Sequence, residues 1–155
     1  MRKFEYVKNA SEYMNEYGNF KLPERSTANS AGYDFFSPVN IVIPPFGTNT
    51  KPTLVPTGVK AQMEKDEFLM LVNRSSNPGK KFLVIPNSMG IIDADYYNNQ
   101  DNEGEMFFAF YNLSNDNIVI YAGDKLGQGI FVKYGITDDD QAKGERTGGF
   151  GSTGE

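Results

Sequence analysis

The chain has 155 residues, 39% of them hydrophobic and 14% aromatic, which is enough for one packed domain that buries roughly 70% of the surface of its unfolded chain. Its net charge of -5 argues against a general nucleic-acid binder, which normally presents a basic face. The chain has no cysteine and no histidine. Disulfides, thiolate zinc sites and imidazole-based catalysis are therefore excluded, and any acid–base chemistry must come from Asp, Glu, Lys or Tyr.

No segment is typical of a targeting signal or a membrane span. Residues 1–6 lack the apolar run of a signal peptide. The apolar run at 106–111 is far shorter than the ~20 residues that a membrane helix needs. We therefore expect a soluble protein with no membrane or nucleic-acid partner, located in the cytoplasm, or in the host cytoplasm if a phage encodes it.

In chain order, the hydrophobic pattern predicts short strands separated by turn residues. A first strand at 4–7 and a helical turn at 11–17 lead into a polar loop. Period-two alternation at 39–43 indicates a half-buried strand. Residues 123–129 are expected to form the turn that leads into the last strand. The remaining expected strands lie at 53–55, 58–63, 68–72, 82–85, 88–92, 106–113, 118–121 and 129–134.

Short strands with frequent turn signals, and no sustained helical period, predict an all-β sandwich or barrel. We expect residues 1–136 to form a single β domain, without an internal repeat or a second domain. Residues 137–155, first acidic and then glycine-rich, are expected to form a flexible C-terminal arm.

Residues 87–96 (Asn-Ser-Met-Gly-Ile-Ile-Asp-Ala-Asp-Tyr) are expected to form a strand, a tight turn and a return strand. They carry two carboxylates, Asp93 and Asp95, and the phenol of Tyr96. Residues two apart on a strand share a face, whereas a turn between them would splay the carboxylates. The pair is therefore either an acid–base site or a turn stabilised by aspartate side chains.

Residues 74–76 (Arg-Ser-Ser) follow the strand expected at 68–72. They offer one fixed positive charge, two hydroxyls and the N–H groups of a turn, which suit phosphate oxygens. The same composition is equally typical of a surface loop.

Residues 149–154 match the pattern G-x-G-x-x-G, but only Glu155 follows, so no helix can begin there and a Rossmann site is excluded. Arg146 precedes this segment and Phe150 lies within it. The segment is either an arm that wraps phosphates and stacks a ring on a base or a disordered tail.

Five segments, in order along the chain, resemble the motifs of the trimeric dUTP diphosphatase (dUTPase) family. The resemblance spans about residues 21–154 and includes the linking sequence Val-Pro-Thr-Gly-Val at 55–59. Each motif alone is short, whereas five in order are a strong signal. The segments are 31–34 (Ala-Gly-Tyr-Asp), 74–76 (Arg-Ser-Ser), 90–96 (Gly-Ile-Ile-Asp-Ala-Asp-Tyr), 123–128 (Gly-Asp-Lys-Leu-Gly-Gln) and the glycine-rich 146–154.

The resemblance implies an all-β, distorted jelly-roll or β-barrel-like fold with a flexible glycine-rich C-terminal arm. It implies a homotrimer whose active sites are shared between subunits, with residues 87–96 from one subunit and the arm from another. The implied activity is Mg2+-dependent hydrolysis of dUTP to dUMP and pyrophosphate by attack of water on the α-phosphorus. This reaction keeps uracil out of DNA and supplies dUMP for thymidylate synthesis. The alternatives are a dCTP deaminase or bifunctional relative on the same fold, and a non-catalytic trimeric nucleotide-binding regulator.

The resemblance also implies a role for each matching residue. Asp93 is the general base for the attacking water, and an ionised carboxylate supplies the base that a chain without histidine needs. Tyr96 lies under the deoxyribose and blocks a ribose 2′-hydroxyl. Asp34 contacts water around a Mg2+ ion that the substrate phosphates hold, so it is an outer-sphere residue. The other expected substrate contacts are Arg74, Ser75, Ser76 and Gln128 at the phosphates, Asn87, Gly90, Ile91 and Ile92 at the uracil, and Arg146, Phe150, Gly151, Ser152 and Thr153 in the closing arm.

Two positions depart from the family pattern. Lys125 stands where the fourth motif usually has arginine, which removes the planar guanidinium fork. One residue fewer separates Arg146 from Phe150 than in the common form of the fifth motif. Residues 1–20 fall outside the resemblance, and residues 98–105 form a long polar segment.

Overall fold

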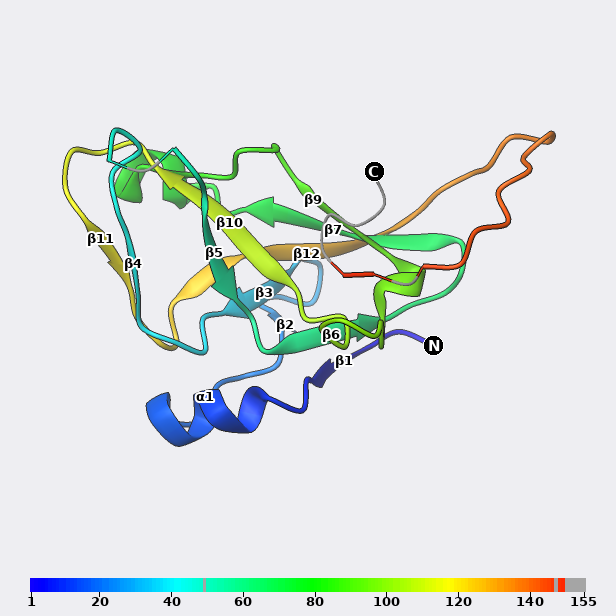
Figure 1. The fold of residues 1–155 in the computed structure, drawn as a ribbon, viewed down its shortest axis with the longest axis horizontal. Helices are drawn as coiled ribbons and strands as arrows, with labels where there is room; N and C mark the ends of the chain where they lie inside the picture. The colour runs from blue at the N-terminus through cyan, green and yellow to red at the C-terminus, as the bar shows by residue number, and fades with distance from the viewer. Residues whose placement is uncertain (49, 147, 150–155) are drawn as a thin grey trace.

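The computed structural model describes residues 1–48, 50–146 and 148–149. It confirms the all-β expectation, because the described chain consists mainly of short strands with one α-helix near the N-terminus (Figure 1). The strands form four sheets, of two, three, two and five strands, and within the described residues they do not close into a barrel. The architecture is an open, distorted jelly roll.

The elements are short because turn residues interrupt the chain at close intervals. Helix α1 ends at Gly18, whose φ of 86° suits glycine. The elements in chain order are β1 (Lys3–Tyr6), α1 (Ala10–Tyr17), β2 (Glu24–Arg25), β3 (Tyr33–Phe36), β4 (Ile41–Ile43), β5 (Thr53–Pro56), β6 (Val59–Gln62), β7 (Glu67–Asn73), the π-helical turn η1 (Asn77–Lys81), β8 (Leu83–Val84), β9 (Gly90–Asp93), the 3₁₀ turn η2 (Ala94–Tyr96), β10 (Phe107–Asn112), β11 (Ile118–Ile120) and β12 (Lys125–Lys133).

The five-stranded sheet carries six of the residues that were predicted to be functional, namely Asp34, Gly90, Ile91, Ile92, Asp93 and Gln128. Its strand order is β2-β3-β12-β7-β9, and every neighbouring pair is antiparallel. Gln128 of β12 lies opposite Asp34 of β3 on one side and Val72 of β7 on the other. Asp93 of β9 lies opposite Phe68, near the other end of β7. Strand β9 is at the edge of this sheet, so one of its sides has no strand partner within the described chain.

Aromatic and aliphatic side chains from distant parts of the sequence form the core. The rings of Phe35 and Phe108 meet edge to face, with centroids 5.6 Å apart, and Leu126 is buried beside them. Burying each of these side chains contributes roughly 1.5–3 kcal/mol. A Cβ atom at Gly127 would lie 2.2 Å from the Phe108 ring and 2.6 Å from the carbonyl oxygen of Val72. Close packing therefore requires glycine at this point of β12.

This packing corrects the expectation for residues 123–129. They were predicted to be a turn before the last strand, but β12 already begins at Lys125 and includes the glycines. A glycine-rich composition is typical of a turn, but in β12 the glycines leave space for neighbouring aromatic rings. A β-bulge lies between Lys125 and Gly127.

The expectation of a strand, a tight turn and a return strand within residues 87–96 is also wrong. Strand β9 runs into the 3₁₀ turn η2, and no return strand follows it. The preceding strand β8 pairs with β10, whereas β9 pairs with β7. The apolar segments on either side of residues 86–87 identified both strands, but they carry no information about which partner each strand finds.

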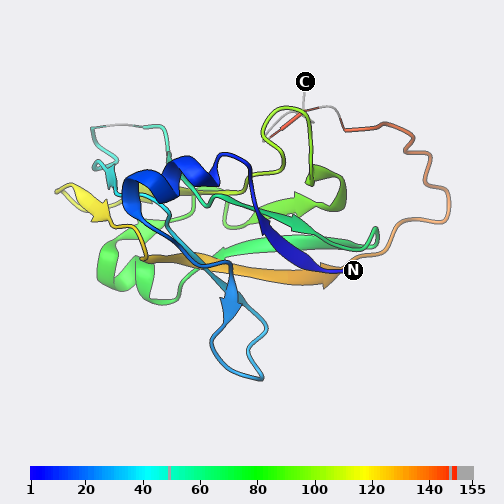
Figure 2. The same ribbon diagram turned by 90° about the horizontal axis from the view of Figure 1, so that it is seen from below.

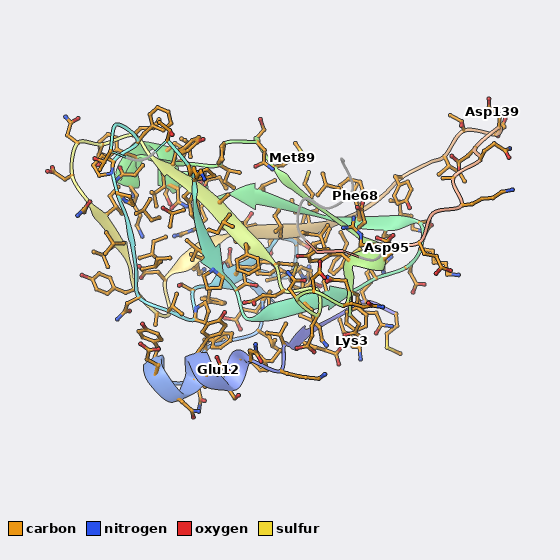
Figure 3. All side chains as sticks on the ribbon, viewed as in Figure 1. Lys3, Glu12, Phe68, Met89, Asp95 and Asp139 are labelled. Carbon is orange, nitrogen blue, oxygen red and sulfur yellow. The ribbon has the colours of Figure 1, made fainter. Side chains whose placement is uncertain are left out.

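The N-terminal and C-terminal segments lie at the outside of the strands. Helix α1 lies along one side of the sheets (Figure 1), and the segment that carries β2 projects from one face (Figure 2). The described part of the arm contains no helix or strand. It extends beyond β12, turns near Asp139 and returns toward Asp95 (Figure 3). No helix in the described chain is both long enough and apolar enough to span a membrane.

Candidate active site

A polar pocket of about 410 Å³, which we call the Arg74 pocket, lies beside strands β3, β12 and β7. Antiparallel pairing of these strands gathers side chains that are far apart in the sequence. Five of the predicted site residues meet here, together with three that were not predicted to be functional. The eight lining residues are Ser26, Asp34, Asn73, Arg74, Ser75, Ser76, Lys125 and Gln128.

The carboxylate of Asp34 is the buried charge of the Arg74 pocket. Its Oδ2 accepts hydrogen bonds from Lys125 Nζ and Ser26 Oγ, both at 2.6 Å, and its Oδ1 accepts one from Gln128 Nε2 at 3.1 Å. Burial opposes ionisation, but the hydrogen bonds, led by that of Lys125, outweigh it and lower the pKa of Asp34. The carboxylate is therefore both ionised and immobilised at neutral pH.

Asp34 suits a water-mediated contact with Mg2+ better than a metal site built from protein ligands. A carboxylate offers about four lone-pair positions, and Lys125, Ser26 and Gln128 occupy three of them. One position on Oδ1 remains for a donor such as a metal-bound water. No cluster of three potential metal ligands exists in the described part of the chain. Mg2+ commonly binds through few carboxylates and the phosphates of its substrate, and the Arg74 pocket fits that mode.

Replacing Lys125 by Ala is expected to destabilise the protein by about 1–2 kcal/mol at pH 7, because it leaves a buried carboxylate with only neutral donors. The pKa of Asp34 is lower in the folded state than in the unfolded state. Its ionised carboxylate therefore stabilises the fold at pH values above the unfolded-state pKa, and this stabilisation is lost as the pH falls through the folded-state pKa. The difference between wild type and variant should therefore shrink below about pH 4. Urea unfolding at both pH values checks this, with Lys125→Arg as the control that keeps the charge. Equal stability of all three proteins at pH 7 would contradict it.

The loop that carries Arg74 is held by asparagine side chains. Asn73 Oδ1 accepts the backbone N–H of Arg74 at 2.9 Å and the Nδ2 group of Asn77 at 2.8 Å. Asn73 Nδ2 donates to the carbonyl oxygen of Leu83 at 2.9 Å. The guanidinium of Arg74 has no hydrogen-bond or ion-pair partner within the described residues. A rigid loop with a free, fixed positive charge is ready to receive an anion.

A second pocket, of about 480 Å³, contains the carboxylates of Asp93, at the end of β9, and Asp95, in the 3₁₀ turn; we call it the Asp93 pocket. The side chains of Asp93 and Asp95 are 53% and 60% exposed, so both reach solvent. Arg146 of the arm binds them together, with Nη2 2.6 Å from Asp93 Oδ2 and Nε 2.9 Å from Asp95 Oδ1. Its guanidinium also lies 5.5 Å from the centre of the Tyr96 ring. In this chain the arm thus returns to its own carboxylates, and its expected crossing to another subunit stays a prediction.

The phenol of Tyr96 is buried and fixed in place. Its hydroxyl donates to the carbonyl oxygen of Glu105 at 2.8 Å and accepts a hydrogen bond from Asn102 Nδ2 at 2.8 Å. Burial raises the pKa of Tyr96, so the phenol is neutral at pH 7. Tyr96 can therefore offer a rigid ring but no anionic group. The sequence shows residues 98–105 as a long polar segment, but its composition does not predict that the segment holds Tyr96.

The carboxyl group of Glu105 links Tyr96 to the N-terminal helix. It accepts the backbone N–H of Gly58 at 2.9 Å and the hydroxyl of Tyr13 at 3.2 Å. Burial raises the pKa of Glu105, and it raises that of Tyr13 to about 12 with a smaller effect from the Glu105 charge. Residues 1–20, which fall outside the family resemblance, thus support the segment beside Tyr96.

Replacing Glu105 by Gln is expected to stabilise the protein by about 1 kcal/mol at pH 7, because an amide keeps the acceptor oxygen and avoids a buried charge. The folded pKa of Glu105 lies above the unfolded value, so ionisation costs stability as the pH rises through it. The cost is absent below the unfolded pKa, and wild type and variant should converge near pH 4. Thermal unfolding from pH 4 to pH 8 measures the difference. A variant that is less stable at pH 7 would show that the charged hydrogen bonds outweigh the cost of burial.

The four residues predicted to contact uracil lie in and just before edge strand β9. The side chains of Ile92 and Ile91 are 2% and 50% exposed, so Ile92 belongs to the core and only its peptide groups are accessible at the edge. Asn87 and Gly90 line a hollow of about 10 Å³. This volume holds about one water molecule, so the hollow is too small for a pyrimidine ring.

The structure separates the predicted site into two groups. Asp93 pairs with Phe68, and Arg74 follows six positions later, which corresponds to roughly 20 Å along an extended strand. The Arg74 pocket and the Asp93 pocket share no lining residue. The predicted residues Phe150, Gly151, Ser152 and Thr153 lie outside the described residues.

Three comparisons with known proteins agree on the family. The dUTPase family model matches residues 18–154. A deoxyuridine 5'-triphosphate nucleotidohydrolase from Lactococcus lactis is 46% identical over 156 residues, covering 99% of this chain and 98% of the relative. The crystal structure of a dUTPase from Streptococcus mutans is 41% identical with a TM-score of 0.76, covering 87% of this chain and 98% of that chain. A mutant dUTPase from phage phi11 of S. aureus, 20% identical with a TM-score of 0.68 over 93% of this chain and 97% of that chain, has the same fold. The chain described here belongs to the dUTPase family.

Proposed function

We propose that the protein hydrolyses dUTP to dUMP and pyrophosphate, which removes dUTP before DNA synthesis and supplies dUMP. The observation that carries this proposal is the Arg74 pocket, where one free guanidinium, two serine hydroxyls and an amide surround an immobilised carboxylate. These groups suit the oxygens of a triphosphate. The 46% identity to a relative named for this reaction supports the same activity.

In the proposed reaction Asp93 takes a proton from the attacking water. The water oxygen forms a bond to the α-phosphorus, and the bond from that phosphorus to the bridging oxygen breaks, so pyrophosphate leaves with the electron pair. The half-exposed carboxylate of Asp93 reaches such a water without any change in the core. Substrate phosphates compete for Arg146, and this exchange frees Asp93 to act as the base.

Charge on the leaving pyrophosphate is offset by Arg74 and the hydroxyls of Ser75 and Ser76. Mg2+ would supply further electrostatic stabilisation when bound with the substrate, and Asp34, with its remaining lone pair, would be its outer-sphere contact. The structure of the mutant dUTPase from phage phi11 reveals how that protein coordinates a structural Mg(II) ion.

Edge strand β9 provides the basis for base selection. A strand edge alternates N–H and C=O groups, and the O4, N3–H and O2 groups of uracil alternate in the same way. The neutral, immobilised ring of Tyr96 supports discrimination by shape at the sugar, since its hydroxyl is already occupied by Glu105 and Asn102.

A homotrimer with shared active sites accounts for the roughly 20 Å between Asp93 and Arg74 in one chain. A water held at Asp93 must attack a phosphorus whose neighbouring phosphates lie at Arg74. One chain cannot supply both groups at that separation, whereas two neighbouring chains can. We infer that residues 87–96 of one subunit face the Arg74 pocket of another.

The test is pyrophosphate release from dUTP, dTTP, dCTP and UTP in the presence of Mg2+. We expect rapid release from dUTP alone, because the thymine methyl, the cytosine amino group and the ribose hydroxyl each conflict with the proposed contacts. Similar rates on all four nucleotides, or no release from dUTP, would refute the proposal. Ammonia release from dCTP would indicate a deaminase instead.

A further inference from the structure

Tyr96 is held by hydrogen bonds whose direction is fixed by the atoms that take part. The carbonyl oxygen of Glu105 can only accept, so the Tyr96 hydroxyl donates its single proton there, at 2.8 Å. The same hydroxyl accepts a hydrogen bond from Nδ2 of Asn102, also at 2.8 Å. The donor and the acceptor capacity of the phenol are therefore both used within the protein.

The side-chain amide of Asn102 has one orientation that satisfies its neighbours. Its Oδ1 atom accepts the backbone N–H of Gly104 at 3.1 Å, and a backbone N–H can only donate. The Nδ2 group therefore faces the other way, where it donates to the Tyr96 hydroxyl and, at 3.2 Å, to the carbonyl oxygen of Glu105. Asn102 is thus a fixed donor to the phenol.

Asn99 fixes the backbone on which Asn102 lies. Its side chain is buried, and the Oδ1 atom accepts the backbone N–H groups of Asp101 at 3.0 Å and Asn102 at 3.1 Å. Its Nδ2 group donates to Asn102 Oδ1 at 2.8 Å and to the carbonyl oxygen of Tyr96 at 2.9 Å. Residues 98–105, which we call the polar loop, therefore hold Tyr96 both at its backbone and at its hydroxyl.

A ring that is anchored at its hydroxyl cannot tilt to make room for a larger ligand. Tilting would pull the phenol away from Glu105 and Asn102, and a buried hydroxyl without its partners is costly. Tyr96 is 3% exposed, so water does not replace those partners. An apolar surface typically rejects a ligand with one additional hydroxyl by only about 100-fold. That modest factor depends on a ring that stays in place.

We propose that Asn102 is a positioning residue that sets the sugar specificity of the protein, because it fixes the Tyr96 ring where the ring excludes a ribose 2′-hydroxyl. This role rests on the proposed hydrolysis of dUTP, in which Tyr96 lies beside the deoxyribose. Asn102 acts through the phenol and touches neither the substrate nor the reacting atoms. It lies outside the five segments that match the family motifs, in the polar loop between the third and the fourth.

The test compares the ratio of kcat/KM for dUTP to kcat/KM for UTP in wild type and variants. Asn102→Ala removes the donor and is expected to lower this ratio roughly 3- to 10-fold, the usual effect of losing one hydrogen bond. The kcat for dUTP should stay within about twofold of wild type, because no group that meets the phosphates has changed. Asn115→Ala, in an exposed turn, is the matched control and should leave the ratio unchanged. An unchanged ratio in Asn102→Ala would overturn the proposal.

Tyr96→Phe distinguishes an effect through the phenol from a general effect on the polar loop. It keeps the ring and every hydrogen bond within the loop, but it removes the hydroxyl that Asn102 holds, so it should lower the ratio by a similar factor. Adding Asn102→Ala to Tyr96→Phe should then cause no further loss, since both changes remove the same contact. Losses that multiply in the double variant would show that Asn102 acts by another route and would contradict the proposal.

Calorimetric binding of non-hydrolysable dUTP and UTP analogues separates this inference from the proposed function. If wild type failed to hydrolyse dUTP, the proposed function would be wrong, and the ratio of the two dissociation constants would still test Asn102. A wild type that binds the two analogues equally or binds neither, or a ratio that Asn102→Ala leaves unchanged, would rule out the role of Asn102.

Discussion

Replacing Asp93 by Asn is expected to lower turnover of dUTP by roughly 100- to 10,000-fold, which is the typical loss when a general base is removed. The amide has nearly the same shape but cannot accept the proton of the attacking water. The side chain of Asp93 is half exposed at the end of β9, so the substitution leaves the core intact. Steady-state pyrophosphate release measures turnover, and calorimetric binding of a non-hydrolysable dUTP analogue should remain within about tenfold of wild type.

Asp95→Asn is the matched control for this prediction. Asp95 lies in the same pocket and binds the same arginine, at 2.9 Å from Arg146 Nε. We expect its replacement to lower turnover by less than about tenfold, because it removes an ion pair at the surface and not the base. Equal losses in the two variants would mean that the carboxylates act as a pair, and a larger loss in Asp95→Asn would reverse their assignment.

The sequence was sufficient for features that depend on the local hydrophobic pattern. The continuous apolar run at 68–72 located β7, and with it the position of Arg74 just after a buried strand. The family motifs then predicted that Asp34 and Gln128 share a site with Arg74, and the register of β12 with β3 and β7 brings them into one pocket.

Features that depend on tertiary contacts were not predictable in this way. Ser26 and Lys125 reach Asp34 from sequence separations of 8 and 91 residues, and neither has a local pattern that reveals its partner. The polar composition of 98–105 predicts a loop. Its actual path requires positive φ angles at Asn98, Glu103 and Gly104, which composition does not specify.

The proposed role of the Arg74 pocket leads to a direct prediction for Arg74. Replacing Arg74 by Ala is expected to lower kcat/KM for dUTP by roughly 100- to 1,000-fold, because it removes the free forked cation of the Arg74 pocket. Arg74→Lys keeps the positive charge but lacks the forked guanidinium, so its kcat/KM should lie between those of Arg74→Ala and wild type. An Arg74→Ala protein with near-normal kcat/KM would exclude this pocket from substrate binding.

Co-expression of Asp93→Asn and Arg74→Ala chains then tests whether two subunits build each site. Each variant alone is nearly inactive, but a mixed oligomer contains some sites with Asp93 from one chain and Arg74 from its neighbour. With random assembly of equal amounts, about one quarter of the sites recover both groups. Activity near a quarter of wild type would therefore require sharing between chains. If one chain supplied both residues, every site would carry a defect and the mixture would be as inactive as either variant alone. That result would mean that the roughly 20 Å between Asp93 and Arg74 along β7 closes by a rearrangement within the chain.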